Sequence, residues 1–259
     1  MNISVAIMHH PARAHLVGAL VGACRPLTAR VVTDPDPSGI RSPLRTAKRA
    51  WAAVGEGATH HLVIQDDALV CDGFAAQVQA AVAARPRHVV ALYSDWNSPQ
   101  NSYLVRRAAA AGAAWAPLSR TDWAPAVALL MPADLARELA AYLAPIPDEV
   151  IDDDEMIARF CRERRLPMLA TVPHLVEKGN VESLTAHQDL YHATVFAGRT
   201  PAGGSLGARF RTGRRPGGQV RARGPLGARG RAPRLAVLPA LHPPRHGGAG
   251  RTRVRLVLA

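Results

Sequence analysis

The sequence predicts an α/β protein whose mostly parallel central sheet is flanked by helices. Two observations support this prediction. Short apolar runs rich in valine and isoleucine alternate with helix-like segments about every 25 residues through the first hundred positions, which is the order expected of a parallel sheet with helical crossovers. Polar and acidic residues directly follow these runs, and ligands of such sheets bind beyond the carboxyl ends of the strands.

The first hundred residues are expected to hold four strands and three helices. Pro11 opens the first helix, and Pro43 opens the second with Ser42 as its N-cap, because serine and proline are preferred at these positions. The predicted helices are about 11–24, 43–54 and 74–84. The apolar runs between them, predicted to be strands, are 2–8, 28–34, 61–65 and 88–94.

The next hundred residues continue the pattern less regularly. A polar loop at 95–102 follows the fourth strand. The segment 152–165 is predicted to be a helix, since it is acidic at its start and basic at its end, as the helix dipole favours. Further elements are strands around 113–117, 126–131 and 167–172, and a helix that begins near Pro132.

The positive charge of the chain belongs to its last segment. The formal charge is +12, but residues 198–259 contain 14 arginines and no acidic residue, which leaves residues 1–197 at −2. We therefore expect one folded domain at 1–197 and a disordered Arg/Gly/Pro-rich tail at 198–259. A tail of this kind could hold nucleic acid through phosphate contacts. A frameshift in a GC-rich gene would also give this composition.

The cysteines and the apolar runs favour a cytoplasmic protein. The three cysteines are far apart and form no CxxC pattern, so neither a zinc site nor a disulfide framework is indicated. The first residues lack the basic start of a signal peptide. No uncharged apolar run approaches the ~18 residues needed to cross a bilayer.

Two adjacent aspartates, Asp66 and Asp67, end the apolar run HLVIQ. Neighbouring side chains on a strand point to opposite faces, and two like charges near an apolar sheet need compensation. A divalent cation such as Mg²⁺ or Mn²⁺ would provide it, because these ions prefer carboxylate oxygens and keep positions open for phosphate. The alternative is a simple turn, which also favours aspartate.

The segment HLVIQDDALVCDGFAAQVQAAV resembles the part of GT-A glycosyltransferases that contains their DxD-type motif. The resemblance extends over about residues 1–190 as architecture and implies a GT-A-like, Rossmann-like fold. It also implies a nucleotide-sugar donor and a Mn²⁺ or Mg²⁺ ion. Asp67 would be the metal ligand and Asp66 a contact to the sugar or ribose. Gln65 stands where many members have an acid.

Other segments resemble the same family. Asp34, after VVT, lies where an acid often faces the nucleotide. SPLRTAKRAW resembles the basic helix before the DxD strand, so Arg45 or Lys48 would contact the donor phosphates or base. His187, in SLTAHQD, lies where some members place a metal-binding histidine; a surface histidine is the alternative. His9, after the first strand, is a further candidate for a nucleotide hydrogen bond.

The acidic run in PDEVIDDDEMIARF provides the candidate catalytic residues. Inverting GT-A enzymes use a carboxylate at the start of an acceptor-side helix as the general base, and the resemblance gives this role to Asp153 or Asp154. Mutual repulsion among clustered carboxylates raises a pKa, which suits a base. Capping of the helix by these acids is an equally favoured interpretation.

The sequence therefore predicts a metal-dependent glycosyltransferase acting on an unknown glycan, lipid, protein or small-molecule acceptor. One alternative is a metal-dependent nucleotidyltransferase or phosphotransferase, although neither a GxxxxGK[ST] nor a GxGxxG motif is present. A second is a nucleic-acid-binding protein that acts through its tail. A GT-A domain that has lost its activity is a third.

Overall fold

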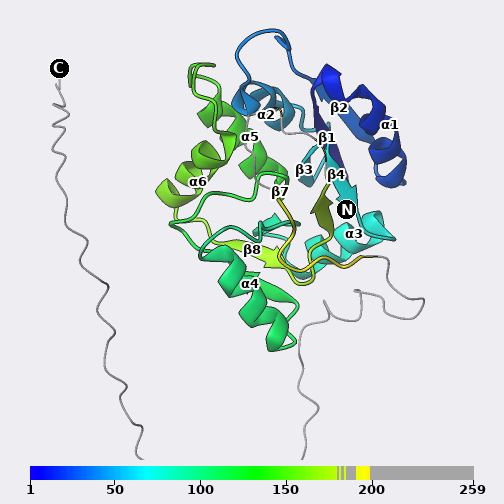
Figure 1. The fold of residues 1–259 in the computed structure, drawn as a ribbon, viewed down its shortest axis with the longest axis vertical. Helices are drawn as coiled ribbons and strands as arrows, with labels where there is room; N and C mark the ends of the chain where they lie inside the picture. The colour runs from blue at the N-terminus through cyan, green and yellow to red at the C-terminus, as the bar shows by residue number, and fades with distance from the viewer. Residues whose placement is uncertain (180, 182–183, 185–190, 199–259) are drawn as a thin grey trace, which may run out of the picture. The chain divides into compact units, whose positions relative to one another are not determined.

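The structure is a computed structural model that describes residues 1–179, 181, 184 and 191–198. Its centre is a seven-stranded sheet with the strand order β2-β1-β3-β7-β5-β8-β6 (Figure 1). The strands of this sheet are β1 (Ile3–His9), β2 (Ala29–Thr33), β3 (His60–Gln65), β5 (Val89–Ala91), β6 (Trp115–Pro117), β7 (Ala128–Pro132) and β8 (Met168–Thr171). A separate two-stranded antiparallel sheet pairs β4 (Ala68–Val70) with β9 (Val176–Lys178).

Most strands of the large sheet run in the same direction. β1 is parallel to both β2 and β3, and β5 is parallel to β8. Only β7 and β6 are reversed, since β7 is antiparallel to β3 and β5, and β6 is antiparallel to β8. The prediction of an α/β protein with a mostly parallel sheet is therefore confirmed.

Helices cover both faces of the sheet (Figure 1). They are α1 (Ala14–Ala23), α2 (Pro43–Ala52), α3 (Phe74–Ala84), α4 (Asn101–Ala110), α5 (Ala133–Leu143) and α6 (Asp153–Glu163), with a 3₁₀ turn η1 (Pro11–Arg13) before α1. Alternate residues of β1 divide the core in two. Val5 and Ile7 pack on the side of α1 and α3, while Ala6 and Met8 pack on the side of α2, α5 and α6, as the two-residue period of a strand requires.

One helix was not predicted. The sequence indicated only a polar loop at 95–102, but α4 begins inside it at Asn101. The carboxylate of Asp122 organises this start: its Oδ2 accepts hydrogen bonds from Ser98 Oγ at 2.5 Å and from the backbone amides of Gln100 and Asn101 at 3.0 and 2.9 Å. These amides are the groups that a helix N-terminus leaves without partners, and here a residue distant in sequence satisfies them.

Two further expectations concern the tail and membrane-spanning helices. The predicted disorder of the tail falls on residues 199–259, which lie outside the described residues. Among the helices that are described, none is long and apolar enough to cross a membrane.

Candidate functional site

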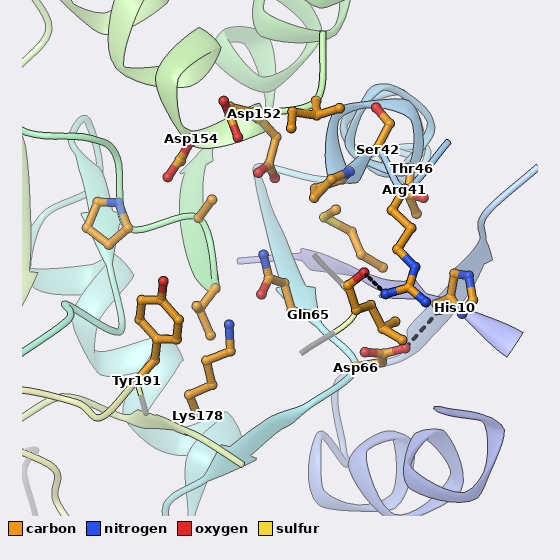
Figure 2. Close-up of a pocket in the computed structure, with 18 of the residues that line it drawn as sticks. His10, Arg41, Ser42, Thr46, Gln65, Asp66, Asp152, Asp154, Lys178 and Tyr191 are labelled. Carbon is orange, nitrogen blue, oxygen red and sulfur yellow. Dashed lines mark hydrogen bonds between the residues drawn. The ribbon is translucent and has the colours of Figure 1, made fainter. Parts of the chain in front are cut away.

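One cavity of about 240 Å³ lies at the carboxyl ends of the parallel strands (Figure 2). It receives residues from each strand exit that the sequence singled out. Those exits contribute His9 at the end of β1, Asp34 after β2, Asp66 after β3 and Asp95 after β5. Because the strands that lead to them are parallel, four segments separated in sequence meet at one edge of the sheet.

Asp66 lies at the cavity and is held by three donors from the end of β1 and the segment that follows it. Its Oδ2 accepts the backbone N–H of His10 at 2.8 Å and lies 3.1 Å from Nδ1 of His9, and its Oδ1 accepts Nη1 of Arg13 at 3.2 Å. The side chain is buried. Asp66 and His9, both expected to contact the donor, therefore lie side by side and form a hydrogen bond with each other.

Asp67 points elsewhere and is not among the described residues that line the cavity. Its Oδ2 accepts the same Nη1 of Arg13 at 2.9 Å and lies 3.9 Å from Nζ of Lys178. Only 1% of its side chain is exposed. Arg13 thus bridges the two carboxylates. Its guanidinium compensates part of the negative charge of Asp66 and Asp67, a role for which the sequence suggested a metal ion.

The residues around Asp67 fit a single metal ligand but not a preformed metal centre. Oδ1 of Asp67 is buried and has no hydrogen-bond partner within the described part of the chain, and such an oxygen is suited to a cation. No cluster of three or more His, Cys, Asp or Glu side chains able to hold a metal is found among the described residues. Mg²⁺ can nevertheless bind through one or two carboxylates completed by substrate phosphates. The other expected ligand, His187, lies outside the described residues.

Asp34 lines the cavity, but its carboxylate is bonded to Arg45. Nε of Arg45 donates to Oδ1 at 2.8 Å and Nη2 donates to Oδ2 at 2.9 Å. Burial alone would raise the pKa of Asp34, but the guanidinium and the Asp36 backbone amide hold it below its usual value. Nη2 also donates to the carbonyl of Asp36 at 2.6 Å, so Arg45 orders the loop after β2.

The two basic residues expected to contact the donor do not line the cavity. Arg45 is committed to Asp34, and Nζ of Lys48 donates to the carbonyl of Ile146 and to Asp148 at 2.7 Å. The side chain of a helix residue points where the 3.6-residue period directs it, and a basic composition does not reveal that direction. Among the described residues, the lysine and arginine side chains that line the cavity are Arg13, Arg41 and Lys178.

The acidic start of α6 forms part of the same cavity, through Asp152, Asp153 and Asp154. Burial, and then the neighbouring charge of Asp154, raises the pKa of Asp153 to about 7. Burial also raises the pKa of Asp154. Asp152 at the N-cap makes no side-chain capping hydrogen bond, and Oδ2 of Asp153 has no partner in the described residues. Capping alone therefore does not account for this cluster.

The structure adds residues that sequence reasoning did not single out as site residues. The hydroxyl of Tyr93 donates a hydrogen bond to Oδ2 of Asp95 at 3.3 Å. Burial raises the pKa of Asp95. Lys178 lies over the ring of Tyr191, with its Nζ 4.9 Å from the ring centroid. The sequence did contain an indication of Asp95, because this acid follows an apolar run. The sequence contained no such indication of Lys178, because only the pairing of β9 with β4 brings this residue to the cavity.

Comparison with known proteins does not assign the chain to a family. It matches no protein-family model, and no curated protein matches it. A functional assignment therefore depends on the geometry and chemistry of this cavity.

Proposed function

We propose that residues 1–197 form a GT-A-like domain that transfers a sugar from a nucleotide-diphosphate-sugar donor to an acceptor hydroxyl. The observation that supports this best is the meeting of two acidic groups in one cavity. Asp66, at the end of β3, is the candidate donor-side acid, and Asp153, at the start of α6, is the candidate acceptor-side acid. Donor and acceptor must meet in one place for a sugar to pass between them.

The donor side offers groups suited to a ribose or sugar. A hydroxyl can donate a hydrogen bond to a carboxylate such as Asp66, and the three donors that already hold Asp66 fix its orientation. Ser42, Thr46 and Gln65 also line the cavity and add further polar atoms. The volume of about 240 Å³ is just below the range of about 300–1,000 Å³ usual for small-molecule sites, so a whole nucleotide sugar would extend beyond it.

The acceptor side offers a base whose pKa suits neutral pH. In the proposed reaction, Asp153 takes the proton of the acceptor hydroxyl, whose oxygen forms a bond to the anomeric carbon. The bond from that carbon to the diphosphate oxygen breaks, and its electron pair stays on the nucleoside diphosphate. A general base is most effective when its pKa lies near the working pH, and the pKa of Asp153 is about 7.

A divalent cation is part of this proposal. Asp67 would hold Mn²⁺ or Mg²⁺ through Oδ1, which has no hydrogen-bond partner among the described residues. Since Asp67 does not line the cavity, its side chain would have to turn toward the cavity for the ion, when bound, to neutralise negative charge on the leaving diphosphate.

The test is a thermal-shift screen of UDP-, GDP-, ADP-, CDP- and dTDP-sugars, each with Mn²⁺ and with EDTA. At least one donor is expected to raise the unfolding temperature, because a ligand at 100 times its Kd adds about 2.7 kcal/mol of stability. Asp66→Asn should reduce the shift, while Glu155→Gln, an exposed acid on the same helix as Asp153, should leave it unchanged. If no donor stabilises the wild type in either condition, the proposal fails.

A further inference from the structure

Lys178 lines the cavity that contains both Asp66 and Asp153. Its Nζ is 3.9 Å from Oδ2 of Asp67, and its side chain is about a quarter exposed. Burial raises the pKa values of Asp95 and Asp153, and the charge of Lys178 offsets part of both increases. Figure 2 shows the ammonium extending into the pocket between Gln65 and Tyr191. One cation therefore acts on carboxylates from three separate segments.

The backbone fixes Lys178 in this position. β9 pairs with β4 so that Lys178 lies opposite Ala68, the residue that follows Asp67. The N–H of the next residue, Gly179, donates to the carbonyl oxygen of Asp67 at 2.6 Å. The strand that bears Lys178 is thus bonded directly to the end of the QDD segment, so its ammonium is held beside the donor-side acids before any ligand binds.

We propose that Lys178 is the side chain that binds the diphosphate of the donor and stabilises its charge as it leaves. This inference rests on the proposed function. A diphosphate bound in the cavity beside Asp66 would be repelled by that carboxylate unless a cation lay close to the phosphates. Arg13 already donates to both aspartates at 3.2 and 2.9 Å, and Arg41 donates to the carbonyl of Leu184 at 2.7 Å.

The contact of Lys178 with Asp67 is looser than those bonds. At 3.9 Å it lies beyond hydrogen-bonding distance, so no hydrogen bond to Asp67 is broken when the ammonium moves to bind a phosphate. A lysine ammonium is a compact charge on a flexible stem with three donors, and it is a common phosphate ligand. The ammonium of Lys178 stabilises the oxygen that receives the electron pair, and the proton of the acceptor goes to Asp153.

The experiment compares the affinity of UDP, GDP, ADP, CDP and dTDP with that of the matching nucleosides, by calorimetry with Mn²⁺ present throughout. Lys178→Met is expected to weaken the binding of the preferred nucleoside diphosphate by about 10- to 100-fold, the usual value of a hydrogen bond to a charged group. Binding of the nucleoside should change by less than about 3-fold, because the base and ribose do not contact Lys178. Lys178→Arg should restore part of the loss.

The matched control is Lys48→Met, which removes a lysine outside the cavity and should leave both affinities unchanged. If Lys178→Met does not fold, Lys178→Gln replaces it in the comparison with Lys178→Arg. Equal binding of the nucleoside diphosphate by the wild type and the Lys178 variant would overturn the role of Lys178 and leave the proposed function intact. If no nucleoside diphosphate binds the wild type, both proposals fail.

Discussion

Arg45 and Asp34 form a buried ion pair with two parallel hydrogen bonds of 2.8 and 2.9 Å. Less than a tenth of either side chain is exposed. The pair joins the end of β2 to the start of α2 and orders one wall of the cavity. Arg45→Met should lower the free energy of unfolding by about 3–5 kcal/mol, because it leaves the Asp34 carboxylate buried without its partner. Urea denaturation measures this loss.

Two further variants separate this effect from a general loss of charge. Asp148→Asn breaks the ion pair with Lys48, where about half of the Asp148 side chain is exposed. It should lower the free energy of unfolding by less than about 1 kcal/mol. The double variant Arg45→Met/Asp34→Asn removes both charges and should be more stable than Arg45→Met alone. If Arg45→Met destabilises the protein no more than Asp148→Asn does, the structural role of the Arg45–Asp34 pair is contradicted.

The proposed sugar transfer should depend on the protonation of Asp153. Its pKa of about 7 means that the carboxylate can accept a proton only when the pH is near or above 7. The transfer rate should therefore rise with pH around a midpoint near 7. Asp153→Asn should reduce the rate by about 10²- to 10⁴-fold, the usual contribution of a general base, whereas Glu155→Gln should keep the wild-type rate and pH profile. An unchanged profile in Asp153→Asn would exclude Asp153 as the base.

The same group should make the protein less stable as the pH rises. The pKa of Asp153 is raised from 3.8 to about 7 by folding, so between these values the folded state retains a proton that the unfolded state releases. Its contribution to stability is fully present below pH 3.8 and is lost as the pH rises through 7. At pH 8, Asp153→Asn should exceed the wild type in unfolding free energy by about 1–4 kcal/mol, with a smaller gain at pH 5. Urea denaturation at the two pH values tests this, and an equal effect at both would contradict it.

The sequence predicted the sheet and the acids better than it predicted the cations. Strands appear as apolar runs, and an acid that ends such a run lies at the sheet edge, so Asp34, Asp66 and Asp95 could be placed from local patterns alone. The acidic run at the start of α6 likewise drew attention to Asp153. These signals lie within a few residues of the element that positions the side chain.

Features that depend on distant pairing could not be predicted in this way. Lys178 reaches the cavity only because β9 pairs with β4, a segment about a hundred positions earlier. The start of α4 depends on Asp122, which is about twenty residues away. Asp66 and Asp67 lie in the turn between β3 and β4, and Arg13 as their common partner requires the segment after β1 to fold back on them.

Gly179 offers a test of how the backbone positions Lys178. A Cβ atom at Gly179 would lie 2.7 Å from the carbonyl oxygen of Asp67, closer than van der Waals contact allows, and that oxygen cannot move without disturbing the QDD segment. Gly179→Ala should therefore cost about 1–3 kcal/mol of stability, as overpacking usually does, and should weaken nucleoside diphosphate binding even though Lys178 remains. The control is Gly22→Ala in α1, where a Cβ meets nothing within 4 Å and helix propensity should add about 0.5–1 kcal/mol. If Gly179→Ala is as stable as the wild type and binds nucleoside diphosphate equally well, the bond from Gly179 to Asp67 does not set the position of Lys178.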